Sequence, residues 1–167
     1  MSTKRLTLAA IFMSMVIALS TVSIPVPGGH LYVVDIAICL IALLFTPKEA
    51  LLICGIGTFL GDYFFYPAPM FVSLVTHGLQ AYVIASIAQT AKSAPNKWLS
   101  LAALLVGAVI MVVGYTLGRA YIYSTPEYSI IKLPWEILQA MLGVVVGYIL
   151  YFYTNIPKIW KRYMVNA

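Results

Sequence analysis

The strongest constraint on this chain is its succession of long apolar runs, separated by short segments rich in proline, glycine and charge. Of its 167 residues, 62% are apolar and only 9% are charged, and the mean hydropathy is +0.96. Because a soluble domain usually carries about a quarter charged residues, this chain lacks the polar surface of a water-facing fold. We therefore expect an all-α integral membrane protein that forms a single domain over residues 1–167.

The apolar runs predict six transmembrane helices, since one span takes about 20 residues. The expected spans are Leu6–Ser23, Tyr32–Phe45, Lys48–Tyr63, Met70–Ala91, Trp98–Tyr121 and Pro134–Thr154. Turn-forming clusters such as Pro25–Gly29 and Tyr66–Pro69 separate them. The second and third spans are short for a bilayer, so we expect them to be tilted or shielded by neighbouring helices.

The basic residues orient the chain. With the N-terminus in the cytoplasm, the inner side receives Lys4, Arg5, Lys48, Lys92, Lys97, Lys158, Lys161 and Arg162. The outer side receives only Arg119 and Lys132, which agrees with the positive-inside rule. We expect an N-in, C-in multi-pass protein of a prokaryotic plasma membrane, and the net charge of +5 indicates orientation rather than nucleic-acid binding. The first run also fits a signal peptide, with Ala18-Leu19-Ser20 as the cleavage site.

Polar side chains on two of the spans follow helical spacing, and each set marks one helix face. On the fourth span they are Ser73, Thr76, His77 and Gln80. On the sixth they are Glu136 and Gln139, with Gly143 and Gly147 along the same face and Pro134 expected in the first turn. Because uncompensated polar groups are costly in hydrocarbon, both faces must meet protein or water.

Further candidate ligand contacts lie in the same layer of the membrane. They are Tyr32, Asp35, Asp62, Tyr66, Tyr115, Arg119 and Trp135. Aromatic walls with a few converging hydrogen-bonding groups suit a small planar polar ligand, in a pocket that opens outward.

Simpler explanations exist for several of these side chains. Asp35 can anchor a helix end, Glu136 can interact with a helix dipole, and Arg119 can form a structural ion pair with Asp62 or Glu136. The aromatic residues can belong to the interfacial belt of a membrane protein.

Several kinds of chemistry are not expected. The chain lacks G-x-x-x-x-G-K-[ST], so it does not hydrolyse a nucleotide by that route. It also lacks G-x-S-x-G and the His and Cys spacings of metal sites, so we expect no enzyme, no metal and no cofactor. Cys39 and Cys54 fall within spans and suit small buried positions.

Three stretches of sequence resemble a known family of transport proteins. They are G-G-H-L-Y-V-V-D-I-A-I-C-L-I-A-L-L-F-T-P-K-E-A from Gly28, G-I-G-T-F-L-G-D-Y ending at Tyr63, and P-M-F-V-S-L-V-T-H-G-L-Q ending at Gln80. Their order, and the length of the chain, are similar to the substrate-binding S component of energy-coupling factor (ECF) transporters. The branch they resemble contains riboflavin, pyridoxine and hydroxymethylpyrimidine binders.

This resemblance implies a six-helix subunit that binds a vitamin or vitamin precursor from outside. The ligand would be of the pyridoxine or hydroxymethylpyrimidine kind. The implied partners are a transmembrane scaffold subunit and two cytoplasmic ATPases. Small residues on the first helix, here Ala9, Ala10 and Ser14, would dock the scaffold.

Two other functions remain open from the sequence. A stand-alone proton-coupled secondary transporter of a small polar solute would use titratable groups such as Asp62 and His77. A membrane enzyme or assembly factor is the third possibility, and no catalytic constellation supports it.

Overall fold

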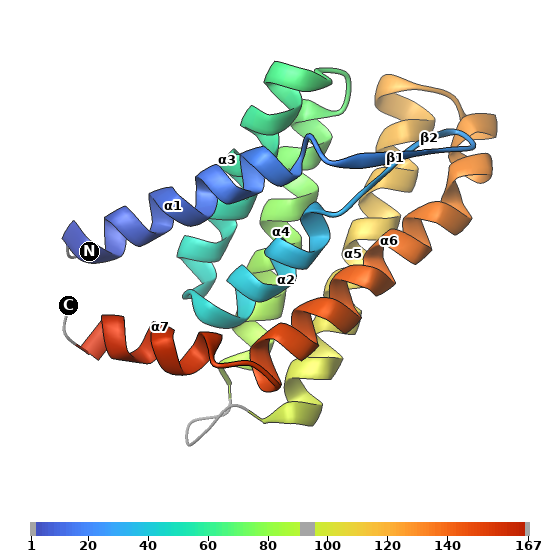
Figure 1. Ribbon diagram of the computed structural model, residues 1–167. Helices are drawn as coiled ribbons and strands as arrows, with labels where there is room; N and C mark the ends of the chain where they lie inside the picture. Colours follow the sequence, from blue (N-terminus) through green and yellow to red (C-terminus); the bar gives the residue numbers. More distant parts are fainter. Residues whose placement is uncertain (1–2, 91–95, 166–167) are drawn as a thin grey trace.

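The computed structural model describes residues 3–90 and 96–165 and is a helical bundle with one short β-hairpin. The elements in chain order are α1 (Thr3–Leu19), β1 (Ser23–Val26), β2 (Gly29–Tyr32), α2 (Val34–Leu44), α3 (Pro47–Phe65), α4 (Met70–Ala88), α5 (Lys97–Gly118), the π-helical turn η1 (Arg119–Tyr123), α6 (Pro126–Phe152) and α7 (Ile156–Val165). The helices α4 and α5 run side by side, whereas α1 and α7 lie across them (Figure 1).

Each of the six expected spans corresponds to one helix. Three stretches of the described residues are long and apolar enough to cross a bilayer: α4, α5 together with η1, and α6. The number of spans and the N-in, C-in orientation stay predictions.

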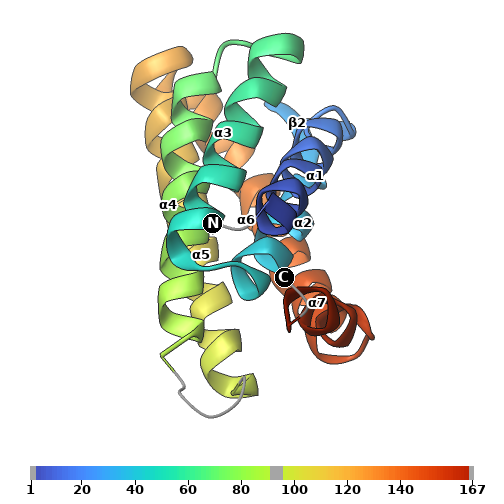
Figure 2. The ribbon, with the colours of Figure 1, turned by 90° about the vertical axis from the view of Figure 1, so that its left-hand side faces the viewer.

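The short helix α2 is a core element. Its 11 residues extend only about 16 Å, well below the thickness of the hydrocarbon layer. All of them except Ile36 are buried. In Figure 2, α1 lies in front of α2 and α6 lies behind it. The predicted shielding of this segment by neighbouring helices is therefore confirmed.

The all-α expectation is wrong for the segment after α1. Ser23 and Tyr32, expected at helix ends, belong instead to antiparallel strands, in which Ser23 pairs with Tyr32 and Val26 with Gly29. Pro27 and Gly28 occupy the two central turn positions, and Gly28 has φ 80°. Proline followed by a glycine with positive φ is the preferred sequence of a type II turn, so a hairpin forms where we expected only a break.

Two further boundaries differ from the expectation. The helix α6 begins at Pro126, capped by the Thr125 side chain, so Pro134 lies inside the helix and not in its first turn. A proline at the first helical position fits without losing a hydrogen bond, which explains the earlier start. The amphipathic helix α7 was not predicted, because its few apolar residues are too short a run for a span.

Two glycines of α6 bring this helix against α2. A Cβ at Gly143 would lie 2.8 Å from the Asp35 Cβ, and one at Gly147 would lie 2.6 Å from the Cys39 Cβ. Real Cβ atoms do not approach so closely, so these positions need glycine. The G-x-x-x-G spacing therefore sets the distance between α2 and α6.

We predict that Gly147→Ala destabilises the protein by about 1–3 kcal/mol, because the new methyl group overpacks against Cys39. The matched control is Gly78→Ala, where the nearest atoms would be 3.5 Å from the new Cβ. It should be neutral or slightly stabilising, since alanine favours helix. Thermal unfolding of the two purified variants in detergent measures the difference, and equal melting temperatures would contradict the packing argument.

Candidate ligand-binding site

A pocket lies at the end of the bundle where the hairpin, the end of α3, the start of α4, η1 and the first half of α6 meet. Its empty space is about 620 Å³, a volume that includes the part open to solvent. It is lined by Ser20, Gly29, His30, Tyr32, Val34, Thr58, Asp62, Tyr66, Pro69, His77, Met111, Tyr115, Arg119, Tyr123, Lys132, Glu136 and Gln139.

The hairpin forms one wall of the pocket and is held by two side chains from other elements. The Tyr32 backbone N–H donates to Gln139 Oε1 at 2.9 Å. Arg119 Nη1 donates to the Gly28 carbonyl at 3.3 Å. Tyr32 lies outside the helices, and burial raises the pKa of its phenol to about 12. Its hydroxyl therefore stays protonated as a donor at neutral pH.

A carboxylate, a hydroxyl and a phenol form a short chain on the side of the pocket between α3 and α5. Ser73 Oγ donates to Asp62 Oδ2, and the Tyr115 hydroxyl lies 2.5 Å from Ser73 Oγ. Because serine has one proton to donate, Tyr115 donates to Ser73. The Tyr115 ring also packs on His77, with 5.1 Å between ring centroids. Asp62, at one end of this chain, and the neighbouring His77 both line the pocket.

A buried network behind the pocket fixes His77 and Gln139. His77 Nδ1 lies 2.8 Å from Gln80 Oε1, which can only accept, so Nδ1 carries the proton. Gln80 Nε2 donates to Asp35 Oδ1 at 3.3 Å, and Gln139 Nε2 donates to Asp35 Oδ2 at 2.6 Å. Asp35 is 1% exposed and does not line the pocket. It acts on the site through the two glutamines.

Two cations face the pocket from η1 and α6. Arg119 Nη2 lies 3.0 Å from Glu136 Oε1, so the ion pair is with Glu136 and not with Asp62. Lys132 is 2% exposed and lines the pocket beneath the hairpin turn. Among the described residues, no ion pair involves Lys132 or Asp62, so both charged groups are available to a ligand.

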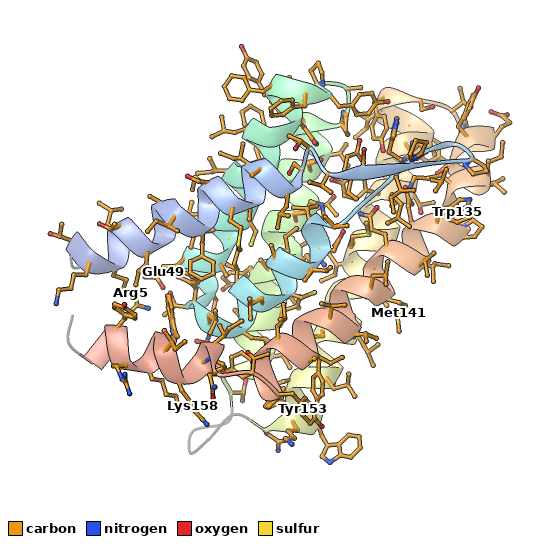
Figure 3. All side chains as sticks on the ribbon, viewed as in Figure 1. Arg5, Glu49, Trp135, Met141, Tyr153 and Lys158 are labelled. Atoms are coloured by element: carbon orange, nitrogen blue, oxygen red, sulfur yellow. The ribbon has the colours of Figure 1, made fainter. Side chains whose placement is uncertain are left out.

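The structure brings most of the predicted contacts together. Those lining the pocket are Tyr32, Asp62, Tyr66, His77, Tyr115, Arg119, Glu136 and Gln139. Asp35 and Gln80 lie behind it in the buried network. Trp135, labelled on α6 in Figure 3, is half-buried and is not among the lining residues. The two polar faces on α4 and α6 are buried, as predicted.

Sequence reasoning missed several lining residues, and Lys132 is the most informative. An expected start of the sixth span at Pro134 leaves Lys132 outside that span, on the outer side. With α6 starting at Pro126, Lys132 precedes Glu136 by four residues and Gln139 by seven, on the same helix face. The Thr125-Pro126 pair is the signal that would have placed it there. His30, Tyr123 and Thr58 carried no such signal.

The three residues assigned to partner docking separate on α1. Ala9 is 7% exposed and belongs to the apolar core. Ala10 and Ser14 are exposed, one helical turn apart. Of these three residues, Ala10 and Ser14 are therefore the ones accessible to a partner.

Comparison with known proteins gives the family. The family model "ECF-type riboflavin transporter, S component" matches residues 1–156. A Pyrococcus woesei protein described as "uncharacterized protein in gap 3′ region" is 30% identical over 128 residues, which cover 75% of this chain and 84% of that protein. The thiamine precursor transporter HmpT of Lactococcus lactis subsp. cremoris (strain MG1363) is 31% identical over 152 residues, 88% of this chain and 85% of HmpT. The chain therefore belongs to the S components of ECF-type transporters and is an integral membrane transport protein, not an enzyme.

Proposed function

We propose that this chain binds a small planar vitamin precursor, of the hydroxymethylpyrimidine or pyridoxine kind, in the pocket beneath the hairpin. The observation that carries the proposal is the convergence of Asp62, His77 and Lys132 on one partly enclosed space. The similarity to HmpT, named for a thiamine precursor, supports the same class of ligand.

The pocket chemistry fits such a ring. Asp62 accepts hydrogen bonds from an amino or hydroxymethyl substituent, and Lys132 donates to a ring nitrogen or hydroxyl. The His77 Nδ1–H donates a hydrogen bond to Gln80, so Nε2 of the neutral ring remains as an acceptor. Tyr115 and Tyr123 add flat aromatic surface against which a planar ligand packs.

We also propose that transport energy comes from separate ATPase subunits through a transmembrane scaffold, because the chain lacks a Walker-type motif. The scaffold would dock on the face of α1 that carries Ala10 and Ser14, since small residues let helix backbones approach closely. The cation-rich end of the bundle would face the cytoplasm and the pocket would open outside.

The purified protein should bind hydroxymethylpyrimidine or pyridoxine with a sub-micromolar dissociation constant. Isothermal titration with these two compounds, riboflavin and thiamine measures the preference directly. Riboflavin and thiamine serve as the larger comparison ligands, which we expect to bind at least tenfold more weakly. If none of the four binds below the micromolar range, the proposed ligand class is wrong.

Asp62→Asn and Lys132→Met should each weaken binding of the preferred ligand about 10- to 100-fold. Each change removes one charge-assisted hydrogen bond, which contributes about 1.5–3 kcal/mol. Glu127→Gln is the control, since Glu127 is an exposed acid of α6 that does not line the pocket. Titration of the three variants should leave only the control at wild-type affinity. Unchanged binding in both pocket variants would show that the ligand binds at another place.

Ala10→Trp and Ser14→Leu should leave ligand binding intact but abolish uptake by cells that express the complete transporter. Bulky side chains on this face would hold the scaffold helix away. Val109→Trp is the control, because Val109 is 61% exposed on α5, a different face. Uptake of radiolabelled ligand is the measurement. Uptake by this chain alone in vesicles, sensitive to a proton ionophore and independent of ATP, would instead favour the secondary transporter.

A further inference from the structure

A chain of hydrogen bonds runs from the backbone of the hairpin to His77 and passes through the buried carboxylate of Asp35. The Tyr32 N–H donates to Gln139 Oε1 at 2.9 Å, and Gln139 Nε2 donates to Asp35 Oδ2 at 2.6 Å. Gln80 Nε2 donates to Asp35 Oδ1 at 3.3 Å, and His77 Nδ1 lies 2.8 Å from Gln80 Oε1. The four side chains are at most 4% exposed, so these bonds form out of reach of bulk water.

The chemistry of two members fixes the direction of every bond in this chain. A backbone N–H can only donate, so the Gln139 amide turns its oxygen to Tyr32 and its NH₂ group to Asp35. An ionised carboxylate can only accept, so Gln80 likewise turns its NH₂ group to Asp35 and its oxygen to His77. The imidazole could donate or accept at Nδ1. It donates here, because the Gln80 oxygen has no proton.

The other ring nitrogen of His77 is left for a ligand. Nε2 bonds to no described residue, and none of the described buried side-chain nitrogens or oxygens lacks a partner. Nε2 is therefore not sealed off, and it opens on the pocket that His77 lines. With the proton on Nδ1, the neutral ring presents a lone pair at Nε2. This part of the pocket thus selects a ligand group that donates a hydrogen bond.

We propose that Asp35, which does not line the pocket, determines this selection. The inference rests on the proposed function, because it concerns the same pocket. Asp35 is a positioning residue: its carboxylate fixes the Gln80 amide, and that amide fixes the proton of His77. A buried side chain of α2 thereby sets which hydrogen-bonding group a ligand must carry where it meets the imidazole.

Asp35→Asn should move the His77 proton from Nδ1 to Nε2. The Gln139 amide keeps its orientation, because the Tyr32 N–H still needs an acceptor. The new amide therefore turns its oxygen to Gln139 and its NH₂ group to Gln80. Gln80 must then turn over, which brings its own NH₂ group to Nδ1 of His77. Since Nδ1 then has to accept, Nε2 carries the proton and donates into the pocket.

Asp35→Asn/Gln80→Glu is the matched control, because it exchanges the amide and the carboxylate and keeps the net charge. The new amide accepts from Gln139 and donates to the new carboxylate, which can only accept from Nδ1 of His77. The proton should therefore return to its wild-type position. Gln80 does not line the pocket, so the exchange removes no direct contact with a ligand.

Nitrogen NMR of the histidine-labelled protein in detergent reads the position of the proton, because the shifts of the two ring nitrogens differ between tautomers. The ligand-free protein is measured at mildly alkaline pH, where imidazole is neutral. Signals that vanish in His77→Gln belong to His77, since His30 is the only other histidine. The wild type and the double variant should show Nδ1–H, and Asp35→Asn should show Nε2–H.

Isothermal titration with hydroxymethylpyrimidine and pyridoxine tests the selection. The affinity should fall about 10- to 100-fold in Asp35→Asn, where two donors meet, and return to within about threefold in the double variant. Nε2–H in the wild type, or one tautomer in all three proteins, would overturn the role of Asp35. Unchanged affinity despite an inverted tautomer would overturn the selection and leave the proposed function standing. If neither compound binds the wild type, the proposed function is wrong, and the tautomers alone decide the role of Asp35.

Discussion

The buried carboxylate of Asp35 is the interaction on which the rest of the bundle depends. An unpaired carboxylate in the core would cost several kcal/mol, so it needs polar partners. It finds them in Gln80 of α4 and Gln139 of α6, while its Cβ abuts Gly143. One side chain on the short helix α2 thereby links three helices. The same two glutamines orient His77 and the Tyr32 backbone, so the stability of the core and the shape of the pocket have a common origin.

Much of this arrangement follows from sequence patterns that have a single physical solution. A polar stripe at helical spacing cannot face lipid, so the burial of Ser73, His77 and Gln80 was predictable. The glycine pair on α6 likewise had to meet another helix closely. Eight of the seventeen pocket-lining residues could be named for the same reason, since polar groups at membrane depth are few.

Other features depend on which of two alternative local structures forms, and the spacing of apolar and polar residues does not decide this. Pro134 and Pro126 are both plausible helix starts, and only the Thr125 cap decides between them. The choice determines whether Lys132 is a loop cation or a pocket residue. Trp135 is a predicted contact that does not line the pocket. An aromatic residue near the membrane interface fits an interfacial belt as well as a pocket wall, so its position alone does not distinguish the two. The hairpin was hidden because proline and glycine clusters indicate a turn without saying which strands flank it.

The separation of charge along the bundle has a consequence for the time scale on which the orientation is decided. Seven described cations, Lys4, Arg5, Lys48, Lys97, Lys158, Lys161 and Arg162, lie away from the pocket end. Turning the bundle over would carry them all through hydrocarbon, at about 2.5–3.5 kcal/mol each. Such a barrier, on the order of 20 kcal/mol in total, would be crossed roughly once a minute at 25 °C. The basic residues would therefore slow inversion of the bundle without, by themselves, fixing its direction for the lifetime of the molecule.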